Sequence, residues 1–255
     1  MTMTIKNEDE IRRMDEAGQV VASIHARMER AIAPGVTTAD LDAIARDTLV
    51  ESGAVSSFLG YHGFPGHICA SVNDEIVHGI PGNRSLREGD IVSIDVGAIL
   101  AGYHGDSAWT YGVGEISDAA RALLLDTEEA LNLAVEAAMS GNRLGAIGHA
   151  VETFARRRGR GVVRNYGGHG IGRQMHEDPH VPNVGRPDRG VVLRSGLTLA
   201  IEPMLTLGSE DTTTLADGWT VVTADGSLSA HFEHTVAVGP SGGRVLTRRL
   251  APVLE

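Results

Sequence analysis

Two aspartates stand in unusual places in the stretch IVSIDVGAILAGYHGDSAWT, residues 91–110. Asp95 interrupts an apolar run with the length and residue types of a buried strand, and Asp106 follows a glycine-containing turn signal. In an antiparallel hairpin centred between Leu100 and Ala101, Asp95 would be directly opposite Asp106. Buried carboxylates facing each other, roughly 5 Å apart, repel unless they share a proton or hold a cation. The pair therefore predicts a metal site, unless Asp106 lies outside a strand or another register turns the two side chains apart.

Three stretches in the second half also place a polar side chain in apolar or glycine-rich surroundings. His169 lies among glycines, Glu202 closes the run LTLAIEP, and Glu233 lies inside HFEHTVAV, whose alternation predicts a half-buried strand. Each residue alone is more often packed or solvated than a ligand. Together with the two aspartates they carry about four negative charges, which would balance two divalent cations roughly 3.5 to 4 Å apart. Oxygen ligands with one nitrogen favour manganese, iron, cobalt or zinc.

Length and composition suit a folded enzyme. The chain has 255 residues, of which 42% are hydrophobic and 22% charged, enough for a substantial core and one large domain or two small ones. A net charge of -11 disfavours nucleic acid and anionic membranes as partners. A single cysteine, Cys69, excludes an intrachain disulfide and fits a reducing compartment. The polar start lacks a signal-peptide stretch and no later run reaches membrane-spanning length, so we expect a cytoplasmic protein.

Each half of the chain is predicted to hold two helices followed by strands and turns. Capping signals at Asn7 and Thr37 begin the first two helices, and the third begins at Ser117. Apolar residues at helical spacing continue to breakers at Pro34, Gly53, Gly141 and Gly159. We therefore expect a single α+β catalytic domain over residues 1–255, with similar halves over about 8–116 and 117–247.

Over nearly its whole length, about residues 5 to 250, the sequence resembles type I methionine aminopeptidases of the pita-bread metallopeptidase fold. In that fold, helices pack outside a curved antiparallel sheet. Five stretches in the same order carry the resemblance: YHGFPGHICASVNDEIVHGIP (61–81), SIDVGAILAGYHGDSAWT (93–110), GGHGIGRQMHEDPHVPN (167–183), LTLAIEPML (197–205) and HFEHTVAV (231–238). Such proteins hydrolyse the first peptide bond of nascent chains and peptides that begin with methionine.

The resemblance implies roles for individual residues. Glu202 would accept a proton from the attacking water and pass it to the leaving amine. His176 would stabilise the oxyanion or position the carbonyl, and His78 would bond the scissile or the next amide nitrogen. The implied ligands of two divalent metal ions are Asp95, Asp106, His169, Glu202 and Glu233, with Asp106 and Glu233 bridging both ions.

A methionine pocket is implied by Tyr61, Phe64, Cys69 and Trp219. Phe58 and Met175 depart from the family pattern, since a small residue or cysteine often stands at the first position and an aromatic at the second. Both remain apolar, so the pocket would keep its character but change its shape. Seven other histidines are assigned mainly to structure, support or solvent, although two of them flank Glu233 and would orient it: His62, His67, His104, His149, His180, His231 and His234.

Three other readings fit parts of the pattern. An Xaa-Pro aminopeptidase or dipeptidase of the same fold usually carries an additional N-terminal domain, whereas here the first helix begins near residue 8. A metal-free binding module would have lost at least one of the five ligands, and all are present. A type II methionine enzyme would need a helical insert between His176 and Glu202, where only 25 residues lie. We expect a monomer that meets nascent chains, with transient ribosome association.

Overall fold

The computed structural model describes residues 3–249, so the ends of the expected 1–255 domain lie outside the described part of the chain. The predicted helices are confirmed: α1 Glu8–Ala31, α2 Thr38–Glu51, α3 Asp118–Ala137 and α4 Gly145–Arg157, with a short 3-10 helix, η1, at Tyr61–Gly63. Asn7 and Thr37 form capping boxes with Glu10 and Asp40, because each cap side chain accepts the backbone N–H that lies three residues ahead. Among residues 3–249, no helix combines the length and the apolar character needed to cross a membrane.

The strands fill the regions between the helix pairs, and all pairs of named strands run antiparallel. They are β1 Val55–Ser56, β2 Ile68–Val72, β3 Glu75–Val77, β4 Ile91–Leu100, β5 Tyr103–Gly112, β6 Gly161–Val162, β7 Gly167–Gly170, β8 Glu177–Pro182, β9 Thr198–Ile201, β10 Met204–Thr206, β11 Thr212–Thr214, β12 Val221–Thr223, β13 Ser229–His231, β14 His234–Gly239 and β15 Gly242–Val245. Two helices followed by strands occur twice along the chain. That the halves 8–116 and 117–247 are pseudo-repeats of one catalytic domain stays a prediction.

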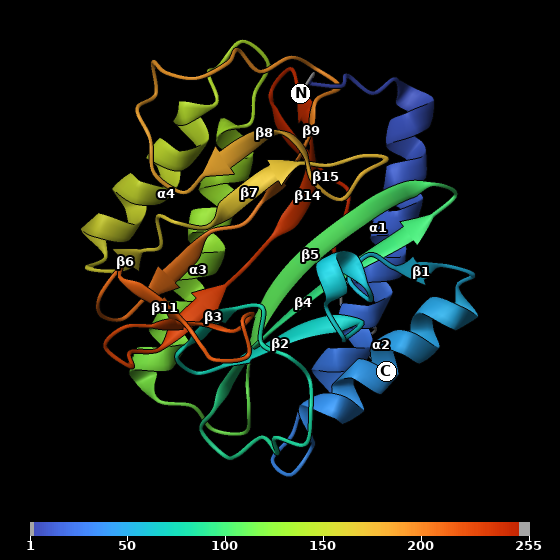
Figure 1. Ribbon diagram of the computed structural model, residues 1–255. Coiled ribbons are helices and arrows are strands. Elements are labelled where there is room, and N and C mark those ends of the chain that lie inside the picture. The colour runs from blue at the N-terminus through green and yellow to red at the C-terminus, as the bar shows by residue number, and fades with distance from the viewer. Residues whose placement is uncertain (1–2, 250–255) are drawn as a thin grey trace, which may run out of the picture.

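Each helix pair covers its own sheet (Figure 1). Helices α1 and α2 pack on the sheet of β1, β4, β2 and β5 through a core that includes Ile24, Leu41 and Ile94. Helices α3 and α4 pack on the sheet of order β15-β14-β9-β7-β8 through a second apolar core. An added Cβ at Gly105 in β5 would lie 2.7 Å from the backbone nitrogen of Gly18, so α1 can approach β5 this closely only because residue 105 is a glycine. The helices thus hold the hairpin of β4 and β5 rigidly from outside.

The register of that hairpin differs from the sequence-based expectation. The structure pairs Asp95 with Ala108 and Gly97 with Asp106, so the direct opposition of the two aspartates was wrong. The turn is centred between Ala101 and Gly102, whose φ angles of 50° and 80° are those of a two-residue turn that matches strand twist. A shift by two residues leaves side chains on the same face because the side-chain period of a strand is two. The aspartates are therefore diagonal neighbours on one face.

The two halves are joined along β5 by side-chain hydrogen bonds and one backbone hydrogen bond in place of a regular ladder. Thr235 Oγ1 donates to the Asp106 carbonyl at 2.8 Å and accepts from the Asp106 N–H at 2.9 Å. Glu233 N donates to the carbonyl of Ala108 at 2.8 Å, and Ser107 Oγ donates to the carbonyl of Glu233 at 2.7 Å. These bonds fix Glu233 beside Asp106, although the two lie more than a hundred residues apart in the chain.

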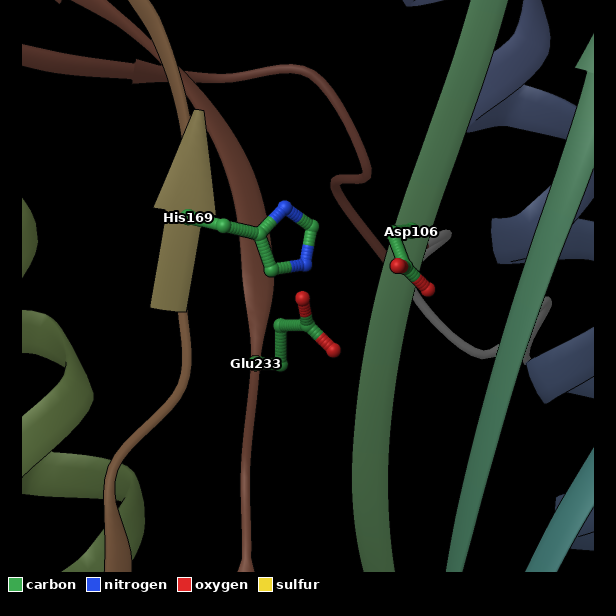
Figure 2. A group of neighbouring side chains, drawn as sticks. All are labelled: Asp106, His169 and Glu233. Atoms are coloured by element: carbon green, nitrogen blue, oxygen red, sulfur yellow. The ribbon is translucent and has the colours of Figure 1, made fainter. Parts of the chain in front are cut away.

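Glu233, which we expected inside a strand, and Glu202, which closes an apolar run, both lie just outside the strands. Glu233 occupies the break between β13 and β14, and Glu202 follows the end of β9. Apolar alternation cannot reveal such breaks, because they arise where neighbouring elements bend the chain toward the interior. The break turns Glu233 into the space between the sheets, where Figure 2 shows its carboxylate near His169.

Candidate metal centre

A cavity of about 180 Å³ lies where the two halves meet. Side chains from both halves line it, and they include every residue that the sequence pattern and the family resemblance place in the site. The lining residues are Phe58, Tyr61, His62, Phe64, Cys69, Val77, His78, Asp95, Asp106, His169, Met175, His176, Glu202, Trp219, His231 and Glu233.

Three side chains of ligand type come together at the base of this cavity. Asp106 on β5, His169 on β7 and Glu233 between β13 and β14 each offer one atom, and these atoms lie within 4.8 Å of one another. All three residues are buried. Figure 2 shows the imidazole and the two carboxylates turned toward a shared space. Donor atoms so spaced, from three separate elements, match the requirement for holding a cation.

The hydrogen bonding of His169 fixes which of its nitrogens faces the site. Nδ1 lies 2.9 Å from the carbonyl oxygen of Gly170, and only a protonated nitrogen can donate to a carbonyl. In the neutral ring, Nε2 then carries a lone pair, and it lies 3.9 Å from Oε1 of Glu202. Metal-binding histidines commonly donate their other ring N–H in this way, which sets the tautomer and the ring orientation.

Asp95 and Glu202 enlarge the acidic group. Asp95 lines the same cavity, where burial and then the charge of Asp106 raise the pKa of its carboxyl. The backbone of Glu202 is anchored by Asn183, whose Nδ2 donates to the Glu202 carbonyl at 3.0 Å. Its carboxylate is flanked by the imidazole of His231, with Nε2 to Oε2 at 3.4 Å. Four carboxyl groups and one free imidazole nitrogen thus converge from five chain segments.

Burial makes this acidic group unstable without a counter-charge. Desolvation, followed by the charges of neighbouring carboxylates, raises the pKa of Asp95 and of Glu233 well above the ordinary range, and the pKa of Asp106 to about 8. Within residues 3–249, the buried oxygens Oδ1 of Asp95, Oδ1 of Asp106 and Oε1 of Glu233 have no hydrogen-bond partner. Buried oxygens of this kind normally bind a donor or a cation. The donor set therefore fits divalent cations.

The raised pKa of Asp106 predicts how the cation-free protein responds to pH. The pKa of this carboxyl is near 4 in the unfolded chain and about 8 in the folded protein, so between these pH values only the folded state keeps the proton. This contribution to stability is therefore lost progressively as pH rises from about 4 and is gone above about 8. With a chelator present, we expect the free energy of unfolding to fall between pH 7 and 8.5. The slope is up to about 1.4 kcal/mol per pH unit for each proton that the protein releases when it unfolds.

Thermal melts in chelator across that range would measure this effect, with a manganese-loaded sample as the control. The variant Asp106→Asn should show a flatter pH dependence than the parent chain in chelator. A metal-free parent protein whose stability stays constant or rises from pH 7 to 8.5 would contradict the assignment of an uncompensated acidic cluster.

Two further histidines, His78 and His176, line the cavity. Burial lowers the pKa of His78, and burial together with His169 lowers the pKa of His176 to about 4, so both rings are neutral at pH 7. Nδ1 of His176 lies 2.8 Å from the hydroxyl of Tyr61, and the two rings stack with centroids 5.4 Å apart. Burial raises the pKa of Tyr61, so its hydroxyl stays protonated and is able to donate to Nδ1. Nε2 of His176 would then carry the proton and face the cavity as a donor.

The remaining wall of the cavity is apolar. Phe58, Phe64, Cys69 and Met175 form a buried cluster, and the indole of Trp219 meets the ring of Phe64 edge to face, with centroids 5.1 Å apart. Burial, followed by the nearby carboxylates, raises the pKa of the Cys69 thiol well above its ordinary value, so the thiol is not a nucleophile at neutral pH. The apolar wall and the acidic base give the cavity one end for a hydrophobic side chain and one for polar chemistry.

The sequence assigned three lining residues too little importance. His62 was placed with the structural histidines, yet it lines the cavity in a left-handed conformation with φ 48°. His231 contacts Glu202 rather than Glu233, and Val77 was not singled out. His234 turns away, with Nδ1 2.9 Å from Thr247 Oγ1. Strand alternation offered one signal for His231. Residues 231 and 233 are two apart and so would lie on the same face of a strand, whereas residue 234 would lie on the opposite face.

Comparison with known proteins relates this geometry to a family. A model of metallopeptidase family M24 matches residues 12–240. Methionine aminopeptidase 1 of Bacillus subtilis is 52% identical over 243 residues, which are 95% of this chain and 98% of that protein. The crystal structure of a methionine aminopeptidase from Thermotoga maritima superposes with a TM-score of 0.95 at 42% identity, covering 97% of this chain and 100% of the other. A prolidase from Pyrococcus horikoshii shares the fold at 21% identity and a TM-score of 0.78, with 98% of this chain and 65% of that one covered.

Proposed function

Because this chain belongs to metallopeptidase family M24 and its acidic cluster adjoins an apolar pocket, we propose that it removes N-terminal methionine from proteins and peptides. Relatives at about 52% identity that span 95% of the chain are methionine aminopeptidases, and the fold is the pita-bread fold that the sequence resemblance predicts. The observation that carries the proposal is the meeting of Asp106, His169 and Glu233 beside the buried wall of Phe58, Phe64, Cys69 and Met175.

Three of the proposed ligands, Asp95, Asp106 and Glu233, have a buried carboxylate oxygen without a hydrogen-bond partner among residues 3–249. Asp106 and Glu233 would be central to the set, because a carboxylate oxygen of each lies within 4.8 Å of the other and of a nitrogen of His169. Asp95, His169 and Glu202 would complete the set. When bound, such a pair of cations supplies the Lewis acidity that makes water a nucleophile near neutral pH. Manganese, iron, cobalt and zinc all suit these ligands.

Side chains around the site would accept and donate protons and orient the peptide substrate. Burial raises the pKa of Glu202, but the contact with His231 and the nearby imidazoles outweigh burial and lower it, so this carboxylate is ionised and able to accept a proton. Nε2–H of His176 would donate to the developing oxyanion, because Tyr61 occupies the other ring nitrogen. His78, held with φ 62° between Tyr166 and Trp219, would bond an amide of the peptide backbone.

The apolar wall suits an unbranched thioether. A methionine side chain adapts to irregular apolar surfaces, and its sulfur is attracted to aromatic rings. Phe58, Phe64 and Trp219 present such rings to the cavity. Met175 completes the wall with a flexible side chain, so we propose that the pocket tolerates close analogues of methionine while rejecting charged first residues.

A direct competition between two substrates tests the proposal. The manganese-loaded protein should cleave Met-Ala-Ser at least about ten times more efficiently than Ala-Pro-Ser, because the apolar pocket binds the methionine side chain at a gain of about 1.5 kcal/mol or more. Initial rates over a range of substrate concentrations would give kcat/KM for each. Preference for the proline peptide would favour the Xaa-Pro alternative, and the absence of metal-dependent cleavage of either would favour a binding module.

We propose further that the protein acts as a cytoplasmic monomer on nascent chains, with transient ribosome association. The lone Cys69 supports a reducing compartment. The net charge of -11 argues against a stable nucleic-acid partner. Sedimentation of the purified protein with and without ribosomes would test both the oligomeric state and the association.

A further inference from the structure

A buried lysine near the start of the chain makes contacts that the proposed chemistry does not use. The side chain of Lys6 is only 5% exposed, and its Nζ donates to Glu177 Oε2 and to Thr4 Oγ1, both at 2.6 Å. The backbone around it is also fixed, since Lys6 N donates to the Gly196 carbonyl at 2.8 Å. A lysine is rarely buried unless it is paired. Its partner lies 171 residues away in the sequence, so the contact ties two distant segments together.

The partner, Glu177, closes the loop that precedes it. Its Oε1 accepts the backbone N–H of Arg173 at 2.9 Å and that of Gln174 at 3.3 Å, while Oε2 receives Lys6. An added Cβ at Gly172 would lie 2.5 Å from Glu177 Oε1 and 2.5 Å from Cε of Lys6. The lysine stem therefore crosses directly over the backbone of Gly172. One carboxylate thus holds the loop over 172–176 together and fastens it to the N-terminal segment.

This loop carries two side chains of the cavity. Met175 forms part of the apolar wall, and His176 faces the acidic base with its ring centroid 4.0 Å from that of His169. On the outer side, the guanidinium of Arg173 lies over the ring of Tyr103 at 4.4 Å. Lys6 itself does not line the cavity. Any effect of Lys6 on the reaction would have to pass through the position of this loop.

We propose that Lys6 and Glu177 are positioning residues, which fix the loop over 172–176 and so set the placement of His176 and Met175. A buried ion pair gives little net stability, because desolvation offsets the attraction, but it enforces one geometry. A displacement of about 1 Å in an active site can lower the rate as much as about 100-fold. The inference rests on the proposed function only for its kinetic readout.

The variant Lys6→Met, which keeps the length of the side chain but removes its charge, tests the pair in the manganese-loaded full chain. We expect kcat for Met-Ala-Ser to fall about ten-fold or more with metal content unchanged, because His176 shifts while the residues proposed to hold the metal stay in place. Selectivity for methionine over leucine should fall as well. The double variant Lys6→Met/Glu177→Gln leaves no unpaired charge, so it should recover Tm without recovering kcat.

A matched control is Arg160→Met, which breaks another partly buried ion pair, with Asp126, at 2.7 Å between Nη2 and Oδ2. It should lower Tm but not kcat. Wild-type kcat and selectivity in folded, loaded Lys6→Met would overturn the positioning role, and so would recovery of kcat in step with Tm in the double variant.

Hydrogen exchange gives a readout that needs no substrate. In the loaded protein, the amides of residues 173 and 174 should exchange faster in Lys6→Met than in the parent chain, because Glu177 loses the partner that holds it in place. Unchanged exchange there would overturn the inference even if the parent chain cleaved no methionine peptide. Failure of the parent chain to cleave Met-Ala-Ser would count against the proposed function alone.

Discussion

Replacement of Asp106 by asparagine is expected to weaken binding of the cation pair by more than about 100-fold and to abolish methionine release. Asp106 lies in the group of three residues whose ligand atoms are within 4.8 Å, and the residue is only 4% exposed. Removal of a residue that only hydrogen-bonds to a metal ligand lowers metal affinity about 10- to 100-fold. Removal of a proposed bridging ligand should therefore lower metal affinity further. The neutral amide also removes one of the negative charges that would balance the cations.

The same substitution should have the opposite effect on the cation-free protein. Burial and like charge raise the pKa of Asp106 to about 8, so an asparagine removes a group whose ionisation destabilises the fold. In chelator above pH 8, Asp106→Asn should therefore melt at a higher temperature than the parent chain. Calorimetric titration with manganese and melting curves in chelator would measure both effects, with substitution of the exposed Asp47 on α2, Asp47→Asn, as the charge-matched control. Parental manganese affinity in Asp106→Asn would exclude this aspartate as a ligand.

Replacement of His176 by alanine is expected to lower kcat by about 100- to 1,000-fold while both cations stay bound. Removal of one donor to a developing oxyanion has an effect of that size. The ring is neutral at pH 7 because burial and His169 lower its pKa to about 4, and Tyr61 is placed to leave Nε2 as the donor. KM should change much less than kcat, since the donor acts mainly on charge that develops in the transition state.

Metal analysis and steady-state kinetics of the same preparation would separate these two effects. His180→Ala is a suitable control, because His180 is an exposed imidazole on β8, four residues from His176. Its kcat should match that of the parent chain. A His176→Ala variant that retains kcat would remove this histidine from the mechanism, whereas one that loses its cations would assign it to the metal site instead.

Local signals in the sequence were enough to place the helices. Asn7 and Thr37 cap α1 and α2 as predicted, because a capping box involves only side chains and backbone within one turn. The hairpin shows the limit of such reasoning. We assumed a turn centred between Leu100 and Ala101, and the resulting pairing of Asp95 with Asp106 was wrong by two residues. A shift of two residues leaves the apolar pattern of a strand unchanged, so the pattern cannot detect it. The backbone conformation of the turn decides where the hairpin is centred.

The sequence by itself determined which side chains stand in apolar surroundings that they would avoid without a partner. Asp95, Glu202 and Glu233 stand out in this way, because an ionised carboxylate is costly to bury. The family-specific stretches added the histidines and the apolar pocket.

Only the tertiary structure decided how these groups meet. Thr235 joins β14 to β5 through both backbone groups of Asp106, and the break between β13 and β14 turns Glu233 inward. The contact between Lys6 and Glu177 is likewise invisible in the sequence, since a lysine and a glutamate 171 residues apart look like two solvated charges. The physical reason is that burial and long-range pairing depend on the packing of whole elements, which no local pattern encodes.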